Sequence, residues 1–164
     1  MPGTPAAAAP KAIGAYGDWG AFREEGSAPR CYIVSPPASI RTSAGGSIRR
    51  GAAALSVGIW PDRGIDGQVY VETGFPIDAG APVTLKAGSR SFTLLPQGES
   101  AWAENAGADA AIITALRGGS AVEVVATSRR GTQVTDRYAL KGFSAALEAA
   151  RNACRGKSSA KSGS

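Results

Sequence analysis

The chain has 164 residues, a formal net charge of +5, no histidine, 22 glycines and 10 prolines. This length suits one domain of ordinary size, and the glycine and proline content is typical of many strands joined by turns. The absence of histidine excludes the commonest general base and metal ligand, and no apolar run approaches the ~20 residues that span a bilayer.

The first residues are rich in proline and alanine, and we expect residues 1–12 to be disordered. They contain no basic region followed by an apolar core, so the printed sequence shows no signal peptide. We predict one domain over residues 13–154. Its first strand is expected directly after Trp19, over residues 20–22.

The central part of the chain predicts short strands separated by turn residues. Strand-forming residues dominate each of these segments, and Pro36 and Pro61 each end one. The glycine-containing turns at 87–89 and 129–131 predict two hairpins, the first with Phe92 on the same face as Leu94. The predicted strands cover residues 30–35, 53–60, 67–75, 83–86, 90–95, 121–128 and 132–140.

Two helices are predicted among these strands. The first covers residues 107–119, with Asp109 as its N-cap. The second follows Gly142, and its large apolar residues recur at steps of four, three and four, which places them on one face. Many antiparallel strands with two short helices predict a mainly β domain, either an antiparallel sandwich or a barrel-like fold. The apolar face of the second helix consists of Phe143, Leu147, Ala150 and Cys154.

The chain has two cysteines, Cys31 at the start of a predicted strand and Cys154 on the inner face of the last helix. One interpretation is that both are free, buried and apolar. A bond between them would leave no cysteine unpaired and would anchor a helix end that solvated sequence follows. We therefore predict a disulfide that tethers the C-terminal helix, which indicates the periplasm or the cell exterior.

The basic excess lies at the C-terminal end. Four basic residues and no acid occur in the last fourteen residues, so residues 1–150 carry a net charge of only +1. We expect residues 155–164 to form a flexible basic tail. Such a tail could contact phosphate or an anionic surface without specificity, but a solvated end is the favoured interpretation.

The sequence contains no complete catalytic, cofactor-binding or metal-binding motif. Gly156-Lys157-Ser158 ends like a phosphate-binding loop, but Arg151 stands where the first glycine is required. Ser158-Ser159-Ala160-Lys161 fits a serine–lysine pattern, but it lies in the predicted tail. We predict no catalytic residue, no cofactor and no bound metal.

Trp19, Trp102, Arg130 and Asp136 are the candidate structural or binding residues. Strand-like sequence borders both tryptophans, which favours core packing, whereas an exposed tryptophan would anchor a partner. Arg130 is expected to pair with Asp136 across its own hairpin, a contact that contributes less than ~1 kcal/mol if it is exposed.

Several stretches resemble the invasion-associated locus B family of alphaproteobacteria, and their order and spacing agree from about residue 14 to residue 154. The C-terminal run with its terminal cysteine is the most specific of them. The matching pieces are GDW at 17–19, RCY at 30–32, AWA at 101–103, and TSRRGTQVTDRYALKGFSAAL at 127–147, followed by Cys154.

This resemblance implies a secreted or periplasmic, mainly β protein with its two cysteines joined. In pathogenic members it implies an association with entry into host cells. It does not imply an enzyme, because the family has no established catalytic residues to carry over.

We therefore expect a non-catalytic exported domain that binds a protein or envelope component through its sheet face or its loops, with no specific nucleic-acid partner. One alternative is a binder of nucleic acid or anionic surfaces through the basic tail. The other is a histidine-free enzyme, which a cleft gathering lysine or arginine with buried carboxylates would favour.

Overall fold

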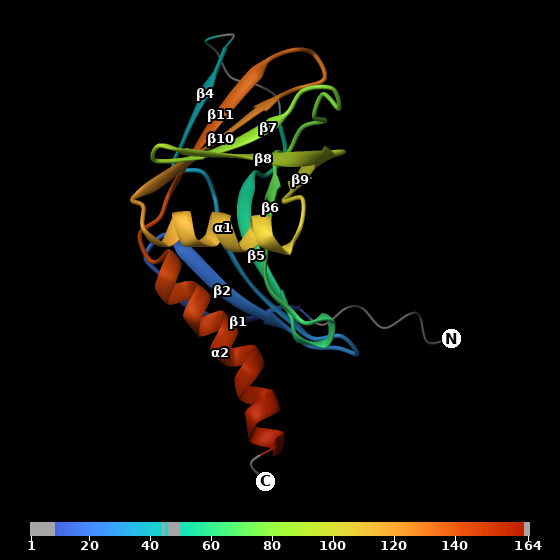
Figure 1. Ribbon diagram of the computed structural model, residues 1–164, viewed down its shortest axis with the longest axis vertical. Helices are drawn as coiled ribbons and strands as arrows, with labels where there is room; N and C mark the ends of the chain where they lie inside the picture. The colour runs from blue at the N-terminus through green and yellow to red at the C-terminus, as the bar shows by residue number, and fades with distance from the viewer. Residues whose placement is uncertain (1–8, 44, 46–49, 163–164) are drawn as a thin grey trace, which may run out of the picture.

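The computed structural model describes residues 9–43, 45 and 50–162, the stretch 156–162 by its backbone only. The described chain forms one antiparallel sheet of 11 strands with two α-helices (Figure 1). The predicted mainly β fold is confirmed. The strands lie in the order β1-β2-β3-β5-β6-β9-β8-β7-β10-β11-β4.

In chain order the elements are β1 (Lys11–Tyr16), β2 (Trp19–Glu24), β3 (Arg30–Ser35), β4 (Ser39–Thr42), β5 (Ala54–Trp60), the 3-10 helix η1 (Pro61–Arg63), β6 (Ile65–Glu72), β7 (Val83–Ala87), β8 (Arg90–Gln97), β9 (Ser100–Trp102), α1 (Ala106–Arg117), β10 (Ala121–Thr127), β11 (Gln133–Ala139) and α2 (Phe143–Ser162).

The sheet has two parts that meet at β8. Residues 90–94 of β8 pair with β7, and residues 95–97 pair with β9. We call β1, β2, β3, β5, β6 and β9 the large half, and β7, β10, β11 and β4 the small half. Their inward side chains form a single core with those of the helices, which includes Leu55, Val57, Leu85, Leu94 and Val124.

Every strand predicted from the sequence is present, with bounds that differ by at most three residues. β1, β4 and β9 were not predicted. β4 and β9 are only four and three residues long, and β1 has the sequence KAIGAY, which is poor in strand formers. β1 begins at Lys11, inside the segment 1–12 expected to be disordered, whereas residues 1–8 lie outside the described residues.

The predicted N-cap of α1 is wrong. Asn105 caps this helix, because its Oδ1 accepts a hydrogen bond of 2.9 Å from the backbone N–H of Ala108. Asp109 lies in the first turn and is buried, where its Oδ1 accepts a hydrogen bond of 2.8 Å from the N–H of Val69. This carboxylate therefore joins α1 to β6.

α2 has the apolar face that the residue spacing predicts, and all four of its predicted residues are buried. The helix starts after Gly142, whose φ of +89° turns the chain out of β11. It is longer than expected, because it continues to Ser162, so residues 155–162 of the predicted tail have a helical backbone. Figure 1 shows α2 lying across the large half of the sheet.

The predicted disulfide is confirmed. Cys31 of β3 and Cys154 of α2 are bonded across a sequence separation of 123 residues, with their Cα atoms 6.1 Å apart. Arg23 of β2 supports the same junction, since its guanidinium donates a hydrogen bond of 2.7 Å to the carbonyl of Ala153. The bond thus closes almost the whole domain into one covalent loop.

Removing this disulfide is expected to destabilise the domain severely. The chain-entropy relation gives about 5 kcal/mol for a loop of this length, which is comparable to the total stability of a small domain. Cys31→Ala, Cys154→Ala and the double variant should lose the same free energy of unfolding, measured by urea titration, because each removes the same bond. A double variant much less stable than either single variant would contradict this account.

Candidate binding surface on the open face of the sheet

Strand alternation gives β3 two different faces. Cys31 and Ile33 are fully buried, and the disulfide shows that their face lies against α2. Arg30 and Tyr32 therefore point to the opposite face, where both are only partly buried. The same alternation in β6 buries its valines on the inner side and turns Tyr70 outward.

The strand register brings such outward positions together in cross-strand pairs. Phe22 lies opposite Tyr32, and Tyr70 lies opposite Trp102. Neither α1 nor α2 covers this side, because both pack on the inner side of the large half within the described residues. We call this surface the aromatic face, which consists of Phe22, Tyr32, Trp60, Tyr70 and Trp102 on β2, β3, β5, β6 and β9.

Four rings of the aromatic face stack in two pairs. The centroids of Phe22 and Tyr32 are 5.4 Å apart with the rings inclined by 23°, and those of Tyr70 and Trp102 are 4.6 Å apart with an inclination of 20°. Offset stacking of this kind contributes about 0.5–1.5 kcal/mol per pair beyond area burial. The rings are thus held in fixed orientations instead of rotating freely in solvent.

Two glycines let aromatic rings lie against the backbone. A Cβ at Gly20 would come within 2.8 Å of the Phe22 ring, and a Cβ at Gly58 would come within 2.5 Å of the Trp60 ring. Both rings therefore occupy the space that a side chain would fill two residues earlier on the same strand. In this arrangement each ring lies along the sheet.

Arg30 connects the middle of the aromatic face. Its guanidinium lies 4.7 Å from the Tyr32 centroid and 5.2 Å from the Trp60 centroid, in the range of cation–π contacts. It also donates two hydrogen bonds, of 3.0 and 3.2 Å, to the Glu24 carboxylate. Burial opposes its charge, but the bonds to Glu24 and the nearby Tyr70 raise the pKa of Arg30 above its usual value.

The outer side of the small half is different in character. Register places Thr84 beside Thr93, and Lys86 beside Glu123, so threonines and charges occupy the positions equivalent to the aromatic rings. Arg41 forms an ion pair of 3.5 Å with Glu123 on this side. The concentration of aromatic residues is therefore a property of the large half and not of every outward position.

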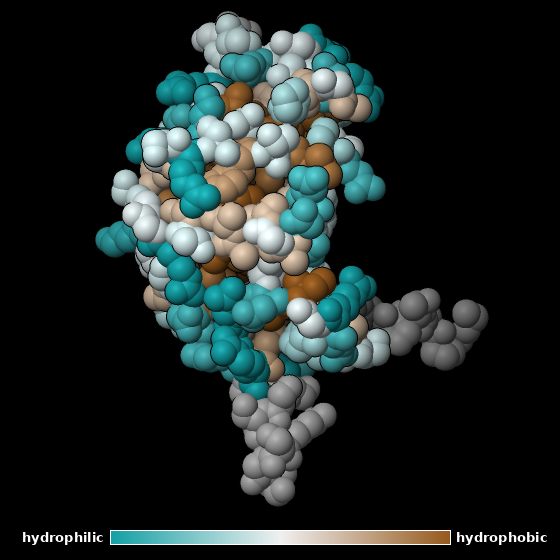
Figure 2. Space-filling view, in the orientation of Figure 1, coloured by the Kyte–Doolittle hydropathy of each residue, from teal (hydrophilic) through white to brown (hydrophobic). Residues whose placement is uncertain are grey.

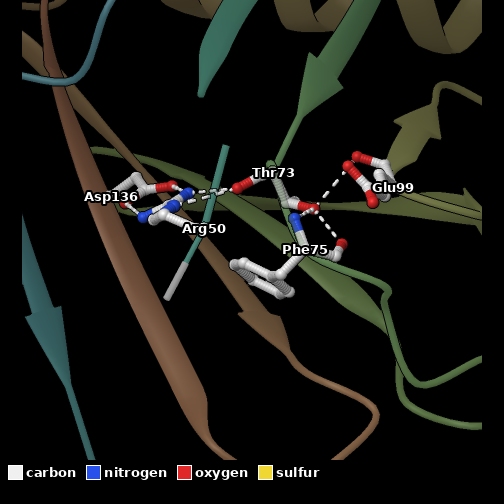
Figure 3. Close-up of polar contacts among 5 residues, drawn as sticks. All are labelled: Arg50, Thr73, Phe75, Glu99 and Asp136. Carbon is white, nitrogen blue, oxygen red and sulfur yellow. Dashed lines mark hydrogen bonds and ion pairs between the residues drawn. The ribbon is translucent and has the colours of Figure 1, made fainter. Parts of the chain in front are cut away.

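A second polar centre is buried between the two halves. Arg50 donates hydrogen bonds of 2.8 and 2.7 Å to the two carboxylate oxygens of Asp136, and its Nε donates one of 3.0 Å to the carbonyl of Thr73. Figure 3 shows the guanidinium between Asp136 on β11 and Thr73 at the end of β6. The side chain of Arg50 is only 9% exposed, and that of Asp136 only 3%. The Phe75 ring lies 5.2 Å from the guanidinium.

This ion pair corrects the sequence prediction that Asp136 pairs with Arg130. Arg130 is exposed in the turn between β10 and β11, whereas Asp136 points inward with Val134 and Tyr138. The buried Asp136 carboxylate is neutralised instead by Arg50, from another part of the chain. The pair joins the large half to the small half and has a structural role.

Tyr138 lies close to this pair in the core and is fully buried. Within the described residues its hydroxyl has no hydrogen-bond partner. Burial raises its pKa strongly, and the nearby charge of Asp136 adds to this effect. The neutral phenol is therefore favoured in the folded protein.

A shallow hollow of about 440 Å³ lies between the N-terminal end of α1 and the β5–β6 hairpin, next to the band of weakly apolar atoms that covers α1 in Figure 2. It contains carboxylates and one arginine, as the histidine-free enzyme alternative requires. Arg151, however, is bound to Asp66, and Asp109 is bound to Val69. The lining also contains no serine, threonine, cysteine, tyrosine or lysine. Its ionisable side chains are Asp66, Glu104, Asp109 and Arg151.

The four candidate residues lie in four different settings. Trp19 is buried with its ring 5.1 Å from Phe143, and its indole N–H donates a 3.0 Å hydrogen bond to the Ala139 carbonyl, so it is structural. Trp102 belongs to the aromatic face. Arg130 is exposed in a turn, and Asp136 is buried with Arg50.

The sequence interpretation did not find the aromatic face as a unit. Part of it could have been predicted from β3, because a disulfide-bonded Cys31 must point inward and its neighbours Arg30 and Tyr32 must then point outward. What connects Tyr32 to Trp60 and Trp102 is the strand order, in which β9 lies beside β6. This order cannot be read from spacing along the chain.

Within the described residues, no group of three or more acidic or cysteine side chains is placed to hold a metal ion. Neither described helix has the length and apolar character of a membrane span. The fold and its surfaces define a disulfide-tethered, mainly β domain with one aromatic sheet face.

Comparison with known proteins identifies the family. The model of the invasion associated locus B (IalB) protein family matches residues 23–151, and the chain belongs to this family. The fold is similar to that of the invasion associated protein B of Bartonella henselae, at 20% sequence identity and a TM-score of 0.56, over 82% of this chain and 92% of that one. Comparison with curated proteins gives no match.

Removing one partner of the buried ion pair between Arg50 and Asp136 is expected to destabilise the folded state. Asp136→Ala leaves the Arg50 charge buried without an opposite charge, and we expect a loss of about 3–5 kcal/mol in the free energy of unfolding. The double variant Arg50→Met, Asp136→Leu should recover much of it. Arg130→Ala, as the matched control, should stay within about 0.5 kcal/mol. Equal losses for Arg130→Ala and Asp136→Ala in urea unfolding would contradict this assignment.

The burial of the Asp109 carboxyl predicts that the stability of the domain depends on pH. Burial raises the pKa of its carboxyl, although the hydrogen bond from Val69 opposes this. The folded state therefore binds the carboxyl proton of Asp109 more tightly than the unfolded chain does. The stabilisation that this proton binding provides is lost as the pH rises through the raised pKa. Asp109→Asn keeps the acceptor oxygen, so it should be more stable than the wild type at pH 7.

The advantage of Asp109→Asn should shrink below about pH 4, where the wild-type carboxyl is also protonated. Urea unfolding across pH 3 to 7 measures this difference. Asp62→Asn, at an exposed position on η1, controls for the loss of one negative charge. A variant less stable than the wild type at pH 7 would contradict the prediction.

Proposed function

We propose that this chain is an exported, non-catalytic domain that binds a protein or cell-envelope component through the aromatic face. The observation that carries the proposal is the group of aromatic rings on five adjacent strands, four of them stacked in two pairs, on a side that neither described helix covers. Tryptophan, tyrosine and arginine are the residues that most often dominate binding energy. The aromatic face contains the first two, and Arg30 contacts its Tyr32 and Trp60 rings.

Export is supported by the disulfide, because such bonds form and persist in the periplasm and outside the cell. Membership of the invasion associated locus B family agrees with this location. The name of the Bartonella henselae relative refers to invasion, and by analogy the bound component in pathogenic relatives would be one that bacteria meet during entry into host cells.

A non-catalytic role is supported by the state of the buried ionisable groups. Asp136 is neutralised by Arg50, Asp109 accepts a backbone N–H, and Tyr138 is sealed in the core. Each of these groups has a structural environment away from the aromatic face. The residues of the aromatic face, in turn, are suited to contact and not to proton transfer.

Cosedimentation with cell envelopes of the source bacterium tests the proposal. The full chain should sediment with them, and Trp60→Ala and Trp102→Ala should each weaken the association at least about tenfold, since tryptophan anchors commonly contribute 2 kcal/mol or more. Thr84→Ala and Thr93→Ala, on the polar side of the small half, are matched controls and should bind like the wild type. Envelope binding unaffected by either tryptophan variant would overturn the use of this face.

A further inference from the structure

We propose that the aromatic face binds an uncharged carbohydrate chain, whose sugar rings stack on Trp60, Trp102 and their aromatic neighbours. This inference rests on the proposed function and specifies its ligand. It follows from the shape of the face, its charge balance and its length. A saccharide offers flat C–H surfaces for ring faces and hydroxyl groups for polar side chains, and the aromatic face presents both kinds of partner.

The first argument is the orientation of the rings. Trp60 occupies the space above Gly58, and Phe22 the space above Gly20, so neither ring stands upright on the sheet. Tyr70 is only 8% exposed beneath its stacked partner Trp102. The rings therefore form a flat surface, with the guanidinium groups of Arg30 and Arg63 beside the Trp60 ring. A flat surface with polar groups at the rings matches the flat C–H faces and hydroxyl groups of a sugar chain.

The second argument is charge. Arg30 is the cation at the centre of the face, and Glu24 neutralises it through two hydrogen bonds. Glu72 is an exposed acid beside Tyr70 on the same face, and Arg63 lies 6.0 Å from the Trp60 ring, so these charges balance. A site that binds single-stranded nucleic acid requires excess positive charge along the phosphate backbone. A neutral face with a paired guanidinium and carboxylate is complementary to hydroxyl groups instead.

The third argument is length. The aromatic face crosses β2, β3, β5, β6 and β9, which at about 4.8 Å between strands gives a strip of about 19 Å. Such a strip accommodates several consecutive sugar units. It therefore favours a polysaccharide segment over a single sugar, and each added unit should increase affinity until the strip is filled.

Isothermal titration calorimetry of the full, oxidised chain with chitohexaose and cellohexaose tests the inference. At least one of these neutral hexasaccharides should bind saturably, and its single-sugar unit should bind at least about tenfold more weakly. Binding should change less than about twofold between roughly 50 mM and 500 mM salt, because no ion pairs form. Trp60→Ala and Trp102→Ala should each weaken it at least about tenfold, while Thr84→Ala should not.

Trp102→Leu separates lost stacking from lost folding, since leucine still covers Tyr70 but lacks a ring face; it should weaken binding like Trp102→Ala. The inference is overturned if neither hexasaccharide binds, if binding survives all three tryptophan variants, or if an oligo(dT) strand binds instead with steep salt dependence. Envelope cosedimentation that depends on Trp60 without hexasaccharide binding would remove the carbohydrate assignment and leave the proposed function standing.

Discussion

The disulfide between Cys31 and Cys154 determines which side of the large half faces α2, and the other features of the domain follow from that choice. Side chains alternate along a strand, so a cysteine bonded inward forces Arg30 and Tyr32 outward. The register then brings Phe22 beside Tyr32. One covalent bond thus separates a face closed by a helix from a face that holds aromatic rings.

The second constraint is the buried ion pair between Arg50 and Asp136. It joins the end of β6 to β11, and so couples the large half to the small half. A buried pair contributes specificity of arrangement more than net stability, because desolvation offsets much of the attraction. The two halves are therefore held in one relative orientation, while the aromatic face remains outside this junction.

Much of the fold could be predicted from local patterns, and the limits of that prediction have physical causes. The face of α2 followed from spacing alone, and strand formers bounded by turns located β3 exactly as the structure has it. The partner of Asp136 could not be found, because Arg50 lies 86 residues away and no local rule connects them. Trp19 and Trp102 have similar neighbours in sequence, yet only the strand order places one in the core and the other on the aromatic face.

The three tryptophans make the central claim directly measurable, because each gives its own indole N–H signal by NMR. Trp60 and Trp102 belong to the aromatic face, and Trp19 is buried as an internal reference. On titration with solubilised envelope fragments, the account predicts that the signals of Trp60 and Trp102 shift or broaden while that of Trp19 stays in place. Fragments that bind and perturb neither Trp60 nor Trp102 would contradict it.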